Sequence, residues 1–182
     1  MGCEMSSTNG DKIERDNYPT PVDVINAMLA KMGWRPGDTF LEPCRGDESR
    51  IYDRVPLPES QKDWAEISMG RDYLAHDFGR QFDVIITNPP FSLTEEFLEK
   101  SLAELKPDGT LIYLQRANFL GSIKRVPFFA RIGFPNKTPV IITRPRFAKG
   151  GTDSCEYAWM VWDRGGRFNV PNGISHLLTR AA

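Results

Sequence analysis

The sequence lacks the features that mark several large classes of protein. Only three of its 182 residues are cysteines, Cys3, Cys44 and Cys155, and none belongs to a Cys-x-x-Cys pair. This scarcity argues against a disulfide framework and a metal site, and it fits a protein of the reducing cytoplasm. No apolar run approaches the ~18 residues of a membrane-spanning helix, so we expect no membrane partner. No charged segment followed by an apolar one opens the chain, and we expect no secretion.

Acidic residues are also missing from one long stretch. Residues 109–152 contain no Asp or Glu, although the whole sequence has 24 acidic residues and a formal net charge of −1. The same stretch has eight basic residues: Arg116, Lys124, Arg125, Arg131, Lys137, Arg144, Arg146 and Lys149. Such charge segregation indicates a surface for an anionic partner, usually nucleic acid, and a solvated basic face is the simpler alternative.

Apolar stretches alternate with amphipathic ones and predict an α/β fold. We expect strands in DTFLEP, DWAEI, FDVIIT, GTLIYLQ, TPVIIT and CEYAWMVWD, with a weakly signalled one in GRDYLAHDFGRQ. In the last of the strong strands, alternation puts Tyr157, Trp159 and Val161 on one face and Met160 and Trp162 on the other. Strands that alternate with helices predict a largely parallel sheet.

Helix signals lie between the strands. Thr20 is the expected N-cap of a first helix, with Pro21 at its first position and Gly33 at its end. Ser92 and Glu95 form a capping-box pattern ahead of a second, amphipathic helix. The stretch SIKRVPFFAR predicts a short third helix.

The length allows one domain with a proper core. We expect a flexible N-terminus over residues 1–16, a single domain over 17–163 with a basic segment at 116–149, and a loose C-terminal tail over 164–182.

The motif ITNPPFS follows directly on a buried strand. Two successive prolines, Pro89 and Pro90, remove two backbone donors and fix two φ angles, so the turn is stiff. The plain interpretation is a rigid connector, because Asn-Pro pairs mark turns. The functional interpretation is a set of hydrogen-bond acceptors held still for chemistry. LEPCRGD also follows a strand, and ligands of parallel sheets bind at the carboxyl ends of strands, so both motifs are candidates to line one crevice.

Four motifs in this order, YPTP, FLEPCRGD, TNPPF and TDSCEYAWMVWD, carry a resemblance to a known family. The chain resembles the S-adenosylmethionine-dependent amino-methyltransferases, most closely the small phage-type DNA N6-adenine methyltransferases, over about residues 18–163. The resemblance implies a Rossmann-like class I methyltransferase fold with a mostly parallel sheet and an antiparallel final strand. It also implies methyl transfer from S-adenosyl-L-methionine to the exocyclic N6 amine of a flipped-out adenine in single- or double-stranded DNA.

In that family, the motif at TNPPF activates the amine. By resemblance, the side-chain oxygen of Asn88 and the carbonyl of Pro89 accept hydrogen bonds from the amine, which localises its lone pair. Pro90 keeps these acceptors rigid, and Phe91 offers a face on which the base stacks.

The resemblance also implies a cofactor site. Its residues are Tyr18, Thr20 and Pro21 at the methionyl end, Glu42, Pro43, Gly46 and Asp47 in the turn, Glu66 at the ribose hydroxyls, and Asp72 with Tyr73 at the adenine. Gly46 lets the backbone approach closely. Related turns have a second glycine where this chain has Glu48, so either the backbone differs there or Glu48 contacts the cofactor.

The sequence shows no separate target-recognition domain. We therefore expect the basic segment to bind DNA, with Lys124, Arg125, Arg144 and Arg146 at phosphates and with relaxed sequence specificity.

Other functions stay open. RNA or protein-glutamine amino-methyltransferases use a similar motif on the same fold, and N4-cytosine enzymes usually have Ser in place of Asn88. A catalytically inert nucleic-acid-binding relative is a further alternative. A nicotinamide dehydrogenase is disfavoured because no G-x-G-x-x-G follows the first strand.

Overall fold

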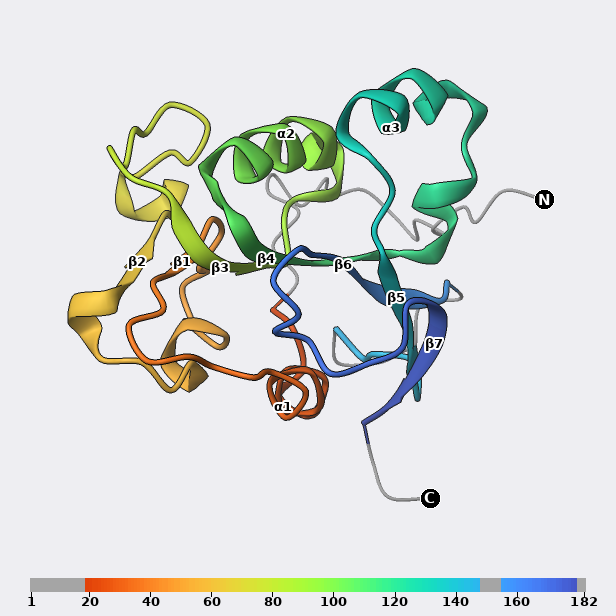
Figure 1. The fold of residues 1–182 in the computed structure, drawn as a ribbon, viewed down its shortest axis with the longest axis horizontal. Coiled ribbons are helices and arrows are strands. Elements are labelled where there is room, and N and C mark those ends of the chain that lie inside the picture. The colour runs from red at the N-terminus through yellow and green to blue at the C-terminus, as the bar shows by residue number, and fades with distance from the viewer. Residues whose placement is uncertain (1–18, 148–154, 180–182) are drawn as a thin grey trace, which may run out of the picture.

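Helices cover both faces of one mixed β-sheet. The computed structural model describes residues 19–147 and 155–179, so the expected flexible N-terminus at 1–16 lies outside the described residues. The helices are α1 Val22–Leu29, α2 Thr94–Glu104 and α3 Val126–Ile132. Figure 1 shows α2 and α3 on one face of the sheet and α1 on the other. None of the helices within the described ranges is long and apolar enough to cross a membrane.

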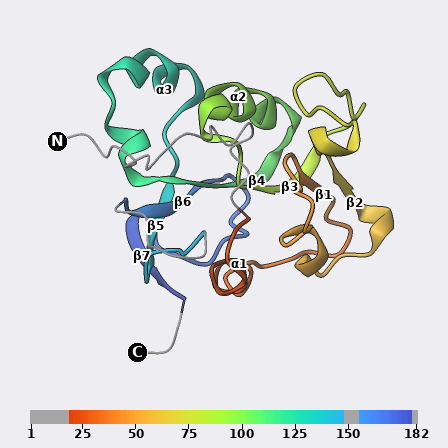
Figure 2. The same cartoon turned by 180° about the vertical axis from the view of Figure 1, so that it is seen from behind.

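Seven strands run in the order β2-β1-β3-β4-β6-β5-β7. Their bounds are Phe40–Glu42 (β1), Lys62–Trp64 (β2), Phe82–Thr87 (β3), Leu105–Arg116 (β4), Lys137–Ile142 (β5), Tyr157–Asp163 (β6) and Gly173–Leu178 (β7). Strands β2, β1, β3 and β4 are parallel, and β6 is antiparallel to both β4 and β5. Figure 2 shows β2 at one end of the sheet and β7 at the other. The predicted mostly parallel α/β fold is confirmed.

The directions of the strands define two edges. Strands β1 to β5 end at what we call the carboxyl edge, and β6 begins there; at the opposite, amino edge β1 to β5 begin and β6 ends. Strand order reverses between β1 and β3, because the chain continues to β2 on one side and to β4 on the other. Ligands of open α/β sheets bind at the carboxyl edge beside such a reversal.

The end of the chain differs from the expectation. The antiparallel strand is β6, and it is not the final one, because β7 forms within residues 164–182 and pairs in parallel with β5. Arg167 and Phe168, ahead of β7, are only 3% and 1% exposed. Residues 164–179 of the expected loose tail therefore belong to the packed fold.

Buried ion pairs hold this segment against the amino edge. Lys137 Nζ lies 2.6 Å from Asp163 Oδ2, and Arg167 Nη2 lies 2.9 Å from Asp38 Oδ1 and 3.6 Å from Asp83 Oδ1. Burial alone would raise the pKa of Asp163, but hydrogen bonds from Lys137 and other donors outweigh it and lower that pKa. For Arg167, burial alone would lower the pKa, but the hydrogen bonds and charge of Asp38 outweigh it and hold that pKa above its usual value.

The predicted helix caps are wrong. The N-cap of α1 is Pro21, and no side chain caps that helix, which ends at Leu29, before Gly33. Ser92 lies in a 3₁₀ turn, η4 (Phe91–Leu93), so α2 begins only at Thr94. The stiff Pro-Pro turn continues into η4 through the bond from Leu93 N–H to the Pro90 carbonyl, 3.0 Å. The helix therefore starts two residues after Ser92, with Glu95 inside its first turn.

The segment GRDYLAHDFGRQ forms no strand. An isolated bridge pairs Glu66 with Arg71, and the Asp72 carboxylate accepts from Leu74 N–H at 3.0 Å, as in an Asx turn. Strand β2 is correspondingly shorter than the predicted DWAEI, because the chain turns at Glu66 into the 3₁₀ helix η3 (Ile67–Met69).

The sheet separates two apolar clusters. Tyr157, Trp159 and Val161 pack on the α1 side, whereas Met160 and Trp162 pack on the side of α2 and α3. The alternation predicted for this strand is confirmed. Strands buried on both faces are typical of sheets covered by helices on both sides.

Candidate active site

The NPPF turn lies at the carboxyl edge, directly after β3. Thr87 is fully buried, Asn88 is half-buried, and Pro89 is buried. The Asn88 Nδ2 atom donates to Thr20 Oγ1 at 3.1 Å, which joins the catalytic candidate to the segment ahead of α1. The sequence motifs YPTP and TNPPF are thus brought together across 68 residues of chain.

The ring of Phe91 lies near another aromatic ring, that of Tyr157, and near the guanidinium of Arg116. Its ring centroid lies 6.1 Å from that of Tyr157 at the start of β6, and Arg116 places its guanidinium carbon 5.2 Å from the Phe91 ring centroid. Arg116 Nε also donates to the Tyr157 hydroxyl at 3.3 Å. Phe147, after β5, packs on the other side of Tyr157 with ring centroids 4.8 Å apart.

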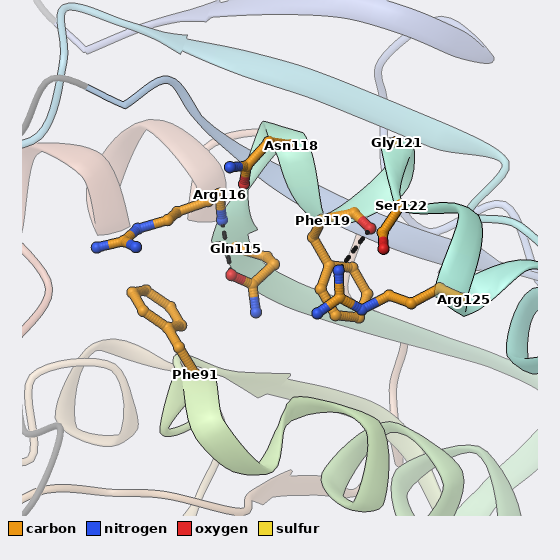
Figure 3. A pocket seen from close by; sticks show the side chains of 8 residues that line it. All are labelled: Phe91, Gln115, Arg116, Asn118, Phe119, Gly121, Ser122 and Arg125. Carbon is orange, nitrogen blue, oxygen red and sulfur yellow. Dashed lines mark hydrogen bonds between the residues drawn. The ribbon is translucent and has the colours of Figure 1, made fainter. Parts of the chain in front are cut away.

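A cavity of about 440 Å³ opens beside Phe91 (Figure 3). The end of β4 and the 3₁₀ turns η5 (Ala117–Gly121) and η6 (Ile123–Arg125) line it. Gln115 is oriented inside it, because its Oε1 accepts from Arg116 N–H at 2.8 Å and its Nε2 donates to Thr94 Oγ1 at 2.8 Å. Figure 3 shows Arg116 above Phe91 on one side and Arg125 on the other. The lining is therefore polar and cationic around two aromatic rings, those of Phe91 and Phe119.

The LEPCRGD turn lies at the neighbouring carboxyl end, that of β1. Gly46 has a φ of +66°, and its N–H donates to Glu66 Oε2 at 2.8 Å. Glu66 Oε1 accepts from Ser68 N–H at 3.1 Å and from Ser68 Oγ at 2.9 Å, while Asp47 Oδ1 accepts from the same hydroxyl at 2.8 Å. The predicted residues Gly46, Asp47 and Glu66 are therefore neighbours.

Glu42 carries a buried carboxyl at the end of β1. Its side chain is 1% exposed, and burial raises its pKa well above the usual value, although a Tyr52 backbone hydrogen bond and the charge of Arg45 oppose this. Among the described residues Glu42 Oε2 has no hydrogen-bond partner. Burial likewise raises the pKa of Cys44 to about 12, so its thiol stays neutral.

The backbone just after Glu48 enters the left-handed region. The left-handed residue is Ser49, with a φ of +52°, rather than the residue at position 48. The Glu48 carboxylate instead pairs with Arg50, at 2.6 Å from Nη2. Arg50 Nη1 donates to the backbone carbonyls of Pro19 and Thr20, at 3.4 and 3.1 Å.

Two predicted cofactor residues, Tyr73 and Asp72, stand apart from this group. Tyr18 lies outside the described residues. Tyr73 is 2% exposed and points to α2, where its hydroxyl meets Ser101 Oγ at 3.0 Å and Glu104 Oε2 at 2.8 Å. Asp72 is exposed and engaged in its own turn. Pro21 and the buried Pro43 lie in the segments that hold Thr20 and Gly46.

Several basic residues of the acid-free stretch pair with carboxylates from other segments of the chain. Arg125 Nε lies 2.9 Å from Glu95 Oε1, Arg144 pairs with Glu156, Arg131 pairs with Glu99, and Lys137 pairs with Asp163. Counting acids along residues 109–152 misses these carboxylates because α2 and β6 supply them. Of the four predicted phosphate contacts, Lys124 and Arg146 are exposed, and Arg125 and Arg144 are in ion pairs.

Sequence reasoning missed Tyr157 as a site residue. It treated Tyr157 only as one face of a strand, yet the hydroxyl reaches Arg116 and the ring packs near Phe91. The signal depends on register, because Arg116 and Tyr157 are paired across β4 and β6. Within residues 19–147 and 155–179, no cluster of His, Cys, Asp and Glu is arranged to hold a metal ion.

Comparisons with known proteins bear on the fold. No protein-family model and no curated protein sequence matches the chain. A Listeria monocytogenes protein, provisionally described as a class I S-adenosylmethionine-dependent methyltransferase, matches with a TM-score of 0.59 at 17% identity, over 93% of this chain and 67% of that one. The methyltransferase subunit of a type I restriction-modification system from Streptococcus thermophilus matches with a TM-score of 0.58 at 16% identity, over 80% and 44%. The M protein of the type I restriction enzyme EcoKI matches with a TM-score of 0.56 at 12% identity, over 82% and 44%.

At such identities the likeness is one of fold. The chain has the Rossmann-like fold of class I methyltransferases, with the candidate site at the carboxyl edge of its sheet. It spans about two thirds of the Listeria protein's length and under half of the length of the two type I subunits.

Proposed function

We propose that the chain transfers a methyl group from S-adenosyl-L-methionine to the N6 amine of adenine in DNA. The observation that carries this proposal is the placement of Asn88. It follows β3 on a Pro-Pro turn, with its amide held by Thr20. Phe91, three residues further along this turn, lines the cavity that Arg116 and Arg125 flank.

The residues of the LEPCRGD turn suit the proposed cofactor. Gly46 at φ +66° allows close backbone approach, and Glu66 keeps a carboxylate at the turn where the resemblance puts ribose hydroxyls. The buried Glu42 Oε2 without a partner is a polar atom that a bound ligand would satisfy. With Thr20, Pro21, Pro43 and Asp47 these residues would hold S-adenosylmethionine, which when bound supplies an electrophilic methyl group. The roles of Tyr18, Asp72 and Tyr73 stay predictions.

The NPPF turn would activate the amine. An exocyclic adenine amine is a weak nucleophile, because its lone pair is delocalised into the ring. Asn88 Oδ1 and the Pro89 carbonyl would accept its two N–H groups and localise the lone pair on nitrogen as it becomes tetrahedral. The stiffness of the Pro89-Pro90 pair keeps these acceptors aimed, so little reorganisation is needed during the reaction. The methyl group would pass directly from the sulfonium sulfur to nitrogen, which leaves S-adenosyl-L-homocysteine, and the nitrogen would release one proton to water. No covalent intermediate on the protein is needed.

The cavity beside Phe91 would take the flipped nucleotide. A base that stacks on Phe91 takes the place of the Arg116 guanidinium, which lies over that ring in the structure. Arg116 is then close to the sugar-phosphate backbone of the same nucleotide, and the exposed Lys124 and Arg146 add cationic contacts. The polar, cationic lining favours a nucleic acid over a protein side chain.

The direct test is labelled-methyl transfer from S-adenosylmethionine to duplex DNA, single-stranded DNA and RNA of mixed sequence. Nucleoside digestion and mass spectrometry identify the methylated product. We expect N6-methyl-2′-deoxyadenosine from DNA, lost in Asn88→Ala and kept in Asn172→Ala, an exposed asparagine ahead of β7 that serves as the matched control. Methylation of RNA, or of cytosine N4, would replace the substrate in this proposal. Cofactor binding without any methylated nucleoside would point to a protein amine, and no cofactor binding would favour the inert alternative.

A further inference from the structure

A continuous set of polar contacts connects the LEPCRGD turn to the catalytic candidate Asn88. Glu48 Oε2 lies 2.6 Å from Arg50 Nη2 and 2.8 Å from its Nε. Arg50 Nη1 donates to the Thr20 carbonyl at 3.1 Å, and the Thr20 hydroxyl accepts from Asn88 Nδ2 at 3.1 Å. Four side chains from three separate segments thus form one path from the cofactor turn to the amide.

Within the described part of the chain, the Thr20 hydroxyl bonds to Asn88 and does not cap the adjacent helix α1. It was the expected N-cap of α1, yet that helix has no side-chain cap. The side chain is 4% exposed, so its hydroxyl depends on a protein partner, and Asn88 supplies one.

The chemistry needs the Asn88 amide in one plane. Terminal rotation of an asparagine side chain is soft and broad, so an unsupported amide samples many orientations. A hydrogen bond to Thr20 restricts this rotation to two states half a turn apart. In the state that the structure shows, Nδ2 donates to Thr20, so the acceptor Oδ1 lies at the opposite end of the amide group. The opposite state would set the Nδ2 donors against a substrate amine, so the substrate itself disfavours it.

We propose that Thr20 is a positioning residue for Asn88, and that Glu48 and Arg50 hold Thr20 in place. This inference rests on the proposed function, because it concerns how Asn88 presents its acceptor. It also gives Glu48, which stands where related turns have glycine, a role through Arg50 rather than through the cofactor. The turn that binds cofactor and the amide that binds substrate are thereby mechanically linked.

The decisive variants are Thr20→Val, which keeps the shape and removes the hydroxyl, and Thr20→Ser, which keeps the hydroxyl. With cofactor and DNA both saturating, Thr20→Val should lower kcat about tenfold, the equivalent of one lost hydrogen bond. Thr20→Ser should restore most of kcat. The Tm of Thr20→Val should stay close to that of the wild type, which shows that the variant is folded. Because Thr20 is also a proposed cofactor residue, the Kd for S-adenosylmethionine is measured for each variant, and kcat is compared only at saturating cofactor.

Other outcomes overturn the inference. A raised cofactor Kd with an unchanged saturated kcat would make Thr20 a plain cofactor contact. An equal loss in the Ser and Val variants would make the methyl group, not the hydroxyl, the important part. A wild type without methyltransferase activity would instead remove the proposed function itself, so the two failures are distinguishable.

A double-mutant cycle tests the more distant part of the path. Glu48→Gln keeps the side-chain shape and weakens the pair with the partly exposed Arg50, so we expect about a twofold lower kcat. In a Thr20→Val background the same change should have no further effect, because it acts through Thr20. Equal effects in both backgrounds would show that Glu48 acts independently of Thr20.

Discussion

Two buried carboxyl groups at opposite edges of the sheet behave in opposite ways. At the carboxyl edge, burial raises the pKa of Glu42, whose Oε2 has no partner among the described residues. At the amino edge Asp163 is also buried, yet hydrogen bonds from Lys137 and Thr110 overcome burial and lower its pKa. The two carboxyl groups differ in the hydrogen bonds that each one receives. At the amino edge, buried acidic and basic side chains pair with one another. At the carboxyl edge, the buried Glu42 Oε2 has no partner among the described residues and is available to a ligand.

The same contrast holds for the neighbours of these groups. Arg167 is held by both oxygens of Asp38 and by the Asp108 carbonyl. At the carboxyl edge, Asn88 and Gln115 are oriented by neutral groups, Thr20 and Thr94, beside an open cavity. The ion pairs of the amino edge stabilise the fold, whereas the neutral hydrogen bonds of the carboxyl edge orient side chains of the candidate site. We therefore expect substitutions at the amino edge to affect mainly stability, and substitutions at the carboxyl edge to affect mainly catalysis.

Breaking the amino edge should have the largest effect, on stability. Arg167→Met keeps much of the side-chain volume and leaves Asp38 and Asp83 without their buried partner. We expect the free energy of unfolding to fall by about 3–5 kcal/mol, as for other buried pairs that lose one member. Urea unfolding measures this, with Arg35→Met as the matched control, because Arg35 pairs with Asp108 at an exposed position. A loss below about 1 kcal/mol would show that this network is not what fixes the segment ahead of β7.

Breaking the carboxyl edge at Asn88 should leave stability almost unchanged and remove activity. Asn88→Ala removes the acceptor, and we expect kcat to fall about 10²–10³-fold, as when one oriented transition-state contact is lost. Asn88→Asp keeps an acceptor oxygen at the same position, and it should lose much less activity than the Ala variant. Single-turnover methyl transfer measures both. Equal losses in the two variants would mean that the Asn88 amide acts by another route than accepting from the amine.

Phe91 tests the aromatic part of the same edge. Base stacking on a side chain contributes about 1–3 kcal/mol, so Phe91→Ala should weaken DNA binding by roughly 5- to 150-fold. Phe91→Trp keeps a face and should bind DNA much more tightly than the Ala variant. A fluorescent base analogue at the target position reports whether the base leaves the duplex. Unchanged DNA affinity in Phe91→Ala would remove stacking on this ring from the proposed function.

The two carboxyl groups give stability opposite dependences on pH. Glu42 has a raised pKa in the folded state, so its contribution is fully present below the unfolded value of about 4.3 and is lost as pH rises toward the folded value. Glu42→Gln removes this titration, and the variant should gain stability relative to the wild type as pH increases from about 5 to 8. Urea unfolding without cofactor at several pH values measures the difference. A difference that does not change with pH would show that Glu42 is ionised in the fold.

Asp163 should show the reverse sign. Its pKa is lowered in the folded state, so its contribution is present above the unfolded value of about 3.9 and disappears as pH falls through the folded value. Asp163→Asn should therefore be most destabilising near neutral pH, and the gap to the wild type should narrow below about pH 4. A gap that widens on acidification would contradict this. Together the two variants sharpen the comparison, because the contributions of Glu42 and Asp163 to stability then change with pH in opposite directions within one protein.

Much of this organisation was predictable from the sequence. Apolar runs gave the positions of β3, β5 and β6, and the rule that ligands bind at carboxyl ends of strands brought the LEPCRGD and TNPPF turns to one edge. Local patterns failed where distant residues compete for the same atoms. The Thr20 hydroxyl fits an N-cap in sequence, yet Asn88, 68 residues away, uses it instead.

Register and edge strands were the harder part. The contact between Arg116 and Tyr157 follows from β4 and β6 pairing in one particular register, which no local pattern specifies. Strand β7 has exposed side chains such as Ile174, at 82%, and so lacks the apolar run that marks buried strands. Its formation depends on the free edge of β5 and on the ion pairs of Arg167 ahead of it.

The smallest expected effect concerns the exposed cations of the acid-free stretch. Lys124 is exposed on η6, near the cavity that Arg125 lines, whereas Arg131 on α3 pairs with Glu99. If Lys124 contacts a phosphate, Lys124→Ala should weaken DNA binding alike for all sequences and lower the slope of log K against log salt by about 1. Arg131→Ala should leave the slope unchanged, because its charge is already balanced within the fold. Equal slopes for both variants would mean that net charge alone governs DNA binding, and that the carboxyl edge is not distinguished from the rest of the surface by its cations.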